Sequence, residues 1–242
     1  MITEPHTLTV SGLRVSVVRK AIKNLHLGVY PPEGLVRVAA PLTVSDAAVR
    51  VAIIGKLRWI KRQRSSFEHQ ARESRRELVS GESHSYEGRR YRMLVVENAS
   101  VGRVELRGHH TLVLHIRPAS TSEDRDRLLQ RWYRDRLRER VPRLLTKWQR
   151  RLGVVVREWG IKKMKTKWGS CNAKARRIWL NLELIKKPPA CLEYVLVHEL
   201  VHLLARNHGQ RFLGIMDHHL PTWRRRRAEL NAAPLAKEVW GC

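Results

Sequence analysis

Short apolar runs alternate with turn-forming residues over the first forty positions of the chain. Residues 13–18, 25–30 and 35–39 are rich in Val, Leu and Ile, a composition that favours β-strands. The second and third runs are separated by Pro31-Pro32-Glu33-Gly34, in which proline and glycine favour a turn. The pattern predicts three short strands at the start of the chain.

Apolar residues at helical spacing predict two helices in the first 150 residues. The first helix begins at Ser45, a residue type that caps helix N-termini, and its apolar positions are Val49, Ala52, Ile53, Leu57 and Ile60. The second begins where Thr121 and Asp124 can form a capping box. Its apolar positions are Leu128, Leu129, Trp132, Leu137, Val141, Leu144, Leu145 and Trp148, with Pro142 as a candidate kink.

The remaining patterns predict further strands and, with the two helices, an α+β fold. Strand character returns at 86–97, 101–106 and 111–117, between the two helices. After the second helix, residues 154–157 and 178–182 predict two strands of a small sheet. The second of these is either a core strand or an edge strand that pairs with an extended ligand. The Pro118–Ser122 stretch is the predicted domain boundary, separating a β-rich region, 1–118, from a mostly helical domain, 119–242.

The stretch from Tyr194 to Leu204 carries the strongest chemical signal. It sets His198 and His202 four residues apart with Glu199 between them. On an α-helix this spacing puts the two imidazoles about 40° apart on one face, so both can reach one metal ion. In the His-Glu-x-x-His arrangement the imidazoles bind Zn²⁺ and the carboxylate is the general base. The surrounding residues are apolar, so these ionisable groups need a partner such as a metal.

His208 is the third ligand predicted from the residues. In an unbroken helix it would lie about 120° round from His202 and about 9 Å further along the axis, out of reach of the same ion. The helix is therefore expected to stop, with Asn207 in a left-handed conformation and Gly209 adding freedom. Other candidates for the third ligand remain open, namely Asp217, His218, His219 and Glu229.

Several segments together resemble the YgjP-like zinc metallopeptidase family, itself similar to SprT-like proteases. They are Lys165–Cys171, Trp179–Leu182, Pro188-Pro189, Tyr194–Leu204, Asn207-His208, Phe212 and Leu220–Trp223. The amino-terminal region resembles that family more weakly, at Val18–Lys20, Ala40–Leu42 and Lys56–Ile60. The resemblance implies zinc, bound through His198, His202 and His208, with Glu199 as the base. We expect a zincin-like metallopeptidase domain that acts on polypeptides. The YgjP branch has also been linked to nucleoside triphosphate pyrophosphate hydrolysis.

The charge of the chain adds a second expectation. There are 48 Lys and Arg against 22 acidic residues, a formal net charge of +26. Such a surplus favours a polyanionic partner, and we expect nucleic acid to bind a basic surface. The arginine-rich face from Arg125 to Arg151, the helix from Arg50 to Arg64 and the Arg224–Arg227 run are the candidate surfaces, and a merely solvated face is the alternative for each.

Composition also sets the expected compartment. No apolar stretch is long enough to span a membrane, and the first twenty residues lack the apolar centre of a signal peptide. The three cysteines, Cys171, Cys191 and Cys242, are too few for a disulfide framework. We therefore expect a cytoplasmic protein, while the oligomeric state is not indicated.

Two alternatives to a peptidase follow from the same residues. In the first, a metal-dependent nucleoside triphosphate pyrophosphohydrolase, Lys162, Lys163, Lys165 and Lys167 would hold the phosphates. In the second, a nucleic-acid-binding protein, the metal is structural. Glu199 argues against the second alternative, because a structural site has no use for a general base.

Overall fold

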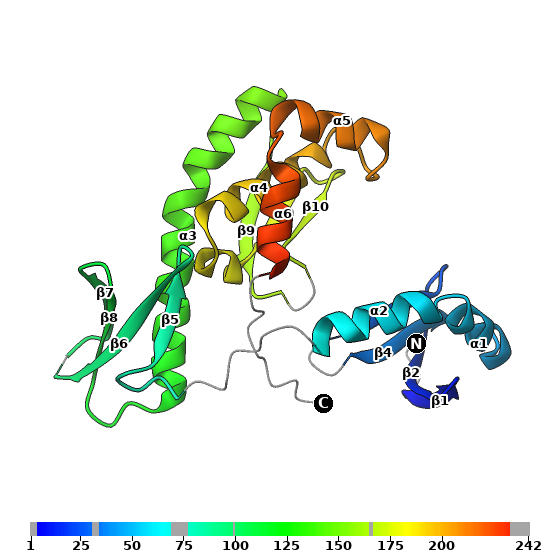
Figure 1. Ribbon diagram of the computed structural model, residues 1–242, viewed down its shortest axis with the longest axis horizontal. Coiled ribbons are helices and arrows are strands. Elements are labelled where there is room, and N and C mark those ends of the chain that lie inside the picture. The colour runs from blue at the N-terminus through cyan, green and yellow to red at the C-terminus, as the bar shows by residue number, and fades with distance from the viewer. Residues whose placement is uncertain (1–3, 31–33, 69–76, 99, 165–166, 233–242) are drawn as a thin grey trace. The chain divides into compact units, whose positions relative to one another are not determined.

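The computed structural model describes residues 4–30, 34–68, 77–98, 100–164 and 167–232 (Figure 1). The chain divides into two compact units, one within residues 1–73 and the other within residues 74–233. Helices and strands occur in both units, largely in separate segments, so the predicted α+β class is confirmed. In the described part of the chain, no helix is both long enough and apolar enough to cross a membrane.

The first unit is a four-stranded sheet with two helices. Its strands are β1 (His6–Val10), β2 (Leu13–Lys20), β3 (His26–Tyr30) and β4 (Leu35–Pro41), in the order β1-β2-β4-β3. Strands β2 and β4 are parallel, and the other pairs are antiparallel. The three predicted strands are confirmed, and β1 is additional. Of the predicted turn, Pro31 to Glu33 lie outside the described residues.

The predicted helix after Ser45 is two helices. Helix α1 (Asp46–Ile54) is capped by Ser45, whose hydroxyl accepts the Ala48 N–H at 3.2 Å, as predicted. It ends at Gly55, and α2 (Leu57–Glu68) follows. Glycine is a poor helix former, which explains an interruption that the apolar spacing alone does not show. Val49, Ile53 and Ile60 are fully buried against the valines of the sheet.

The second unit begins with a second four-stranded sheet. Its strands are β5 (Ser83–Tyr86), β6 (Arg89–Glu97), β7 (Arg103–Arg107) and β8 (Thr111–Ile116), in the order β5-β6-β8-β7. The predicted run 86–97 is divided by a tight turn in which Gly88 has φ +79°, a conformation that suits glycine. The other two predicted strands are confirmed.

Helix α3 (Ser122–Leu152) is the longest element of this unit. The predicted capping box is present, because Thr121 and Asp124 each accept the other's backbone N–H. The helix continues through Pro142 and ends at Gly153 in a left-handed conformation. Its buried face, which includes Tyr133 and Leu137, joins one hydrophobic core with strands β5 to β8. The predicted boundary after residue 118 therefore falls inside this unit, and the chain divides near residue 73 instead.

A three-stranded sheet follows α3. It consists of β9 (Glu158–Lys162), β10 (Gly169–Asn172) and β11 (Arg177–Asn181), in the order β10-β11-β9. One prediction is corrected here, because the first strand begins at Glu158 rather than lying at 154–157. Strand β11 is central in the sheet, so of the two interpretations of 178–182 the core strand is confirmed and the edge strand is wrong. The two edge strands are β9 and β10, and β10 comes from the segment expected to be a loop, whose small and polar residues hide its strand character.

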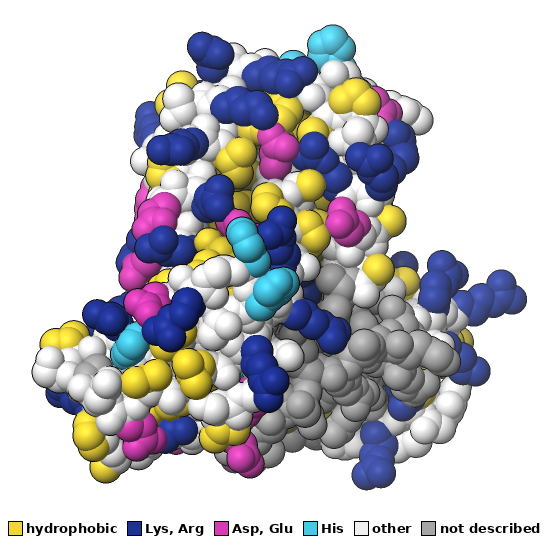
Figure 2. All heavy atoms as spheres, turned by 60° about the vertical axis from the view of Figure 1, so that its left-hand side comes forward, with side chains coloured by type: hydrophobic (Ala, Val, Ile, Leu, Met, Phe, Trp, Pro, Cys, Tyr) yellow, Lys and Arg dark blue, Asp and Glu magenta, His cyan; other side chains and the backbone are white. Residues whose placement is uncertain are grey.

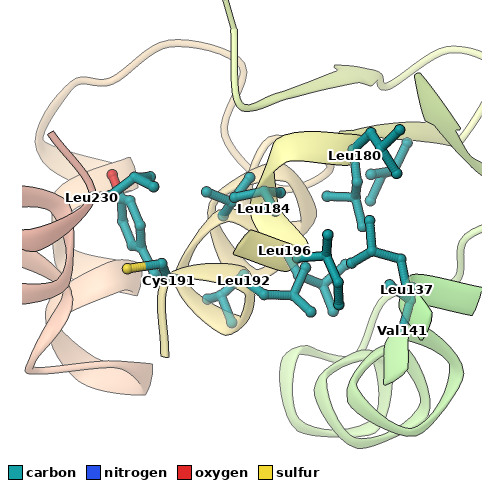
Figure 3. Close-up of a cluster of buried hydrophobic side chains, with 14 of the residues drawn as sticks. Leu137, Val141, Leu180, Leu184, Cys191, Leu192, Leu196 and Leu230 are labelled. Atoms are coloured by element: carbon teal, nitrogen blue, oxygen red, sulfur yellow. The ribbon is translucent and has the colours of Figure 1, made fainter. Parts of the chain in front are cut away.

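The last part of the chain is helical. It contains the 3₁₀ helix η1 (Leu182–Lys186) and helices α4 (Pro189–Val201), α5 (Gln210–His219) and α6 (Trp223–Ala232). Figure 3 shows how Leu192 and Leu196 of α4 lie in the core, with Leu180 of β11 and Leu137 of α3 on one side. On the other side, Leu230 of α6 lies near Cys191 (Figure 3). Helix α4 is thus held from several sides, which fixes the residues it carries.

Candidate metal centre

Helix α4 carries His198 and Glu199 near its C-terminal end. The helix ends at Val201, and His202 is the C-cap residue, so the helix is shorter than the predicted 194–204 stretch. Asn207 does not adopt the predicted left-handed conformation. Turns from Leu203 onward reverse the chain instead, and Gly209 caps the start of α5. The expected consequence still holds, because the helix stops in time for His208 to turn back.

Three histidines meet at this point. One ring nitrogen from each of His198, His202 and His208 lies within 4.8 Å of the other two. The closest pair is His198 Nε2 and His208 Nε2, at 3.0 Å. His208 is exposed, whereas the other two are partly buried, so the site opens to solvent on the His208 side. Within the described residues this is the one cluster of three or more His, Cys, Asp or Glu side chains with such spacing.

The donor set fits a zinc ion. Two nitrogen ligands on a tetrahedral zinc are about 3.3 Å apart, close to the observed His198–His208 separation of 3.0 Å. His202 Nδ1 lies 3.2 Å from the Ala205 carbonyl, so a proton on Nδ1 leaves Nε2 free as a ligand. Burial, with the neighbouring His202 and His208, lowers the pKa of His198 to about 3. Neutral imidazoles are the form that binds a metal.

Phe212 supports the three imidazoles from α5. Its ring centroid lies 4.9 Å from those of His198 and His202 and 4.6 Å from that of His208. The side chain itself is 2% exposed and belongs to the core. The buried ring restricts the side-chain rotamers that the three histidines can adopt. In the sequence, Phe212 is one of the positions that resemble the family, but nothing there indicates that it contacts the ligands.

Glu199 lies in a tight, largely dry environment. The residue is 5% exposed. A Cβ on Gly169, the first residue of β10, would lie 2.6 Å from Glu199 Oε1, so the carboxylate packs directly on the strand backbone. Burial raises the pKa of Glu199 to about 7, against the opposing effect of Lys167. A carboxylate with a pKa near neutrality is suited to accept and release a proton.

The competing ligand candidates lie elsewhere. Asp217 accepts hydrogen bonds from Trp223 Nε1 at 2.7 Å and from Arg224. His218 and His219 contact each other edge to face at the end of α5, with centroids 4.7 Å apart. Glu229 is an exposed residue of α6 whose charge acts on Cys191. The structure brings none of these four side chains into the histidine cluster.

Cys171 is also close to Glu199 but has the wrong chemistry for a nucleophile. Burial and the Glu199 carboxylate raise the pKa of its thiol to about 11. The thiolate is the reactive form of cysteine, so this side chain is inert at neutral pH.

Comparison with known proteins agrees with this geometry. No curated protein and no solved structure gives a significant match to the chain. The family model described as YgjP-like, metallopeptidase domain, matches residues 23–233. The matched range includes the whole second unit, residues 74–233. A metallopeptidase family implies a metal ion, which the three histidines could bind. The chain belongs to the YgjP-like metallopeptidase family.

Proposed function

We propose that the protein is a zinc-dependent metallopeptidase that hydrolyses peptide bonds through a metal-activated water. The observation that supports it best is the placement of a buried carboxylate, Glu199, on the same helix as two members of a three-histidine cluster. His198, His202 and His208 would hold the ion, and Glu199 would be the general base. A structural zinc site has no need of such a carboxylate, and its fourth ligand is normally a protein side chain.

The protein's own residues account for the proton transfers. A bound zinc ion supplies a Lewis acid and lowers the pKa of a water molecule towards 7. Glu199 accepts that proton on a carboxylate oxygen and transfers it to the amine that leaves when the peptide bond breaks. Burial raises the pKa of Glu199 above that of an exposed carboxyl, which favours a role as both proton acceptor and proton donor in one cycle.

Strand β10 supports an extended polypeptide as substrate. It is an edge strand, and its first residue, Gly169, contacts Glu199. An extended peptide that pairs with the free edge of β10 would add a strand to the sheet and pass beside the histidine cluster. Backbone pairing of this kind requires an unfolded, extended segment and discriminates little between amino-acid sequences.

The deciding experiment compares activity and metal content in Glu199→Gln. We expect the variant to bind zinc and fold as the wild type does, because Gln has nearly the same shape, but to lose turnover by at least about 100-fold. The assay uses unstructured polypeptides and nucleoside triphosphates side by side, with zinc supplied. Near wild-type peptide turnover in Glu199→Gln would refute the assigned base.

The triphosphate arm tests the second candidate function. Lys167 lies close enough to Glu199 to lower its pKa, so a cation that could pair with a phosphate lies near the site. Hydrolysis of a nucleoside triphosphate without any cleavage of polypeptides would make the protein a pyrophosphohydrolase. The three-histidine donor set favours the peptidase, because triphosphate hydrolysis usually relies on Mg²⁺ with oxygen ligands.

A further inference from the structure

The sheet that borders the metal centre has two different faces. Helix α4 packs on one face, where Ile178 and Leu180 of β11 are fully buried. On the other face, the strand register places Trp179 of β11 between Ser170 of β10 and Gly160 of β9. Those three residues are all partly exposed. We call this side of the sheet the Trp179 face; its residues are Glu158, Gly160, Lys162, Ser170, Asn172, Arg177 and Trp179.

Trp179 differs from the two other tryptophans of this region. Trp159 and Trp168 pack against the core of the unit, but Trp179 does not. Its indole instead covers Gly160, where a Cβ would lie 2.2 Å from a ring carbon. Glycine at this position lets the ring lie against the strand backbone, so the ring is held in place without being buried in the core.

Two cations flank the indole. Lys162 Nζ lies 3.8 Å from the ring centroid, and Arg177 Cζ lies 5.7 Å from it. Lys162 forms no ion pair with a described residue. Arg177 makes one long ion pair, at 3.4 Å, with Glu158, and its buried Nε has no hydrogen-bond partner in the described structure. Lys162 therefore keeps its capacity to bind an anion, and the guanidinium of Arg177 adds a second positive charge beside the ring.

The chain around this face is strongly basic. Between residues 157 and 177 the single acidic residue is Glu158. The basic residues of the same stretch are Arg157, Lys162, Lys163, Lys165, Lys167, Lys174, Arg176 and Arg177. Proteins that hold single strands combine an aromatic ring with neighbouring Lys and Arg side chains: bases stack on the ring, and phosphates contact the cations.

We propose that the Trp179 face binds single-stranded nucleic acid without reading its sequence. One base stacks on the Trp179 indole, and Lys162 moves from the ring to a phosphate together with Arg177. Any base has a flat face that can stack, whereas the bases of a duplex are stacked on each other. A single strand is therefore preferred over a duplex. This binding does not depend on the proposed peptidase activity, although Gly169 of the same sheet touches Glu199.

The arginine-rich face of α3 is a weaker candidate for the same role. Many of its cations are already paired within the protein, such as Arg127 with Asp124, Arg136 with Glu139 and Arg138 with Asp135. Figure 2 shows one side of the molecule on which Lys and Arg side chains are numerous but have Asp and Glu among them. Such a surface attracts polyanions in general. The two tryptophans of α3 are less suited to base stacking, because Trp148 lies in the core and Trp132 packs against it.

The test measures binding of the zinc-loaded full-length protein to oligodeoxythymidine, a duplex of the same length, and ATP. We expect Trp179→Ala to weaken oligodeoxythymidine binding about tenfold and duplex binding much less. Trp179→Phe, which keeps a ring, should stay within about threefold of the wild type. Lys162→Gln should reduce the slope of log affinity against log salt by about 0.7 for the single strand.

The matched control is Arg131→Gln on α3, an exposed arginine outside the Trp179 face. It should weaken single-strand and duplex binding equally. Unchanged oligodeoxythymidine affinity in Trp179→Ala overturns the proposal, as does equal loss for single strand and duplex. ATP that binds as tightly as the oligonucleotide would replace the single strand with a nucleotide as the ligand. If Trp179→Ala unfolds, then Trp179→Phe and Lys162→Gln decide the question.

Discussion

The three histidines of the metal centre lie on different parts of the chain. His198 and His202 come from one helix and its C-cap, while His208 returns after a series of turns. We expect His208→Ala to lower zinc affinity by at least about 100-fold, since loss of a direct ligand costs more than loss of an outer hydrogen-bond partner. Competition with a fluorescent chelator measures the change.

His218→Ala is the matched control for this prediction. His218 is exposed at the end of α5 and lies outside the cluster. The His218→Ala substitution should leave zinc affinity unchanged. A larger loss in His218→Ala than in His208→Ala would move the third ligand to the end of α5.

Gly169 controls the position of the general base. The Cβ of an alanine there would lie 2.6 Å from Glu199 Oε1 and 2.7 Å from Glu199 Cγ, closer than packed atoms allow. We expect Gly169→Ala to displace the carboxylate and lower kcat by about 100-fold, while zinc content stays near one ion per chain. Gly214→Ala in α5, where no atom lies within 4 Å of the new Cβ, should be close to wild type. Equal activity of the two variants would contradict the assigned contact.

The residues of the site were predictable to different degrees. His198, Glu199 and His202 follow from helical spacing, which is a local property of the sequence. His208 follows from the need for the helix to stop, although the turn that forms is different from the expected one. Gly169 and Phe212 were not identified as site residues. Their contacts depend on the packing of β10 and α5 against α4, which no local pattern encodes.

At the scale of elements, Glu193 connects three helices. From α4 it accepts hydrogen bonds from Lys147 Nζ at 2.8 Å and Trp148 Nε1 at 2.9 Å, both on α3, and from Arg226 on α6 at 2.7 Å. Burial alone would raise the pKa of Glu193, but these donors hold it at about 2. We expect Glu193→Gln to lower the free energy of unfolding at pH 7 by about 2 kcal/mol.

The effect should depend on pH in one direction. The pKa of Glu193 is about 2 in the folded protein and 4.5 without these contacts. The stabilisation is thus complete above pH 4.5 and is lost as the pH falls towards 2. In urea titrations, the wild type and Glu193→Gln should converge over this range. Glu229→Gln, an exposed site on α6, should show no such difference, and a gap that widened at low pH would refute the role of the carboxylate.

The elements themselves were predictable where period and caps agree. Helix α3 has both an apolar stripe and a capping box, and both are present in the structure. Strand β10 has neither a period nor β-branched residues, and it forms because β11 supplies a partner. The apolar spacing continues from α1 into α2 without interruption, so this spacing does not reveal the helix end at Gly55.

At the scale of the molecule, the two units have separate hydrophobic cores. One core contains residues from Leu8 to Ile60, and the other contains residues from Leu78 to Leu230. No residue belongs to both cores within the described structure. We therefore expect a fragment of residues 74–242 to fold alone and bind one zinc ion. Circular dichroism and elemental analysis of the purified fragment measure this directly.

A fragment of residues 119–242, cut at the boundary that the sequence suggested, separates the two interpretations of the domain structure. It lacks the six buried strand residues of the core that α3 joins, namely Tyr86, Tyr91, Met93, Leu112, Leu114 and Ile116. Burial of each contributes about 1.5–3 kcal/mol, so their loss is comparable with the whole stability of a domain, about 5–15 kcal/mol. This shorter fragment should aggregate or remain unfolded, and zinc should not rescue it. If it folded as cooperatively as residues 74–242, strands β5 to β8 would be an accessory to the metal centre and not part of its core.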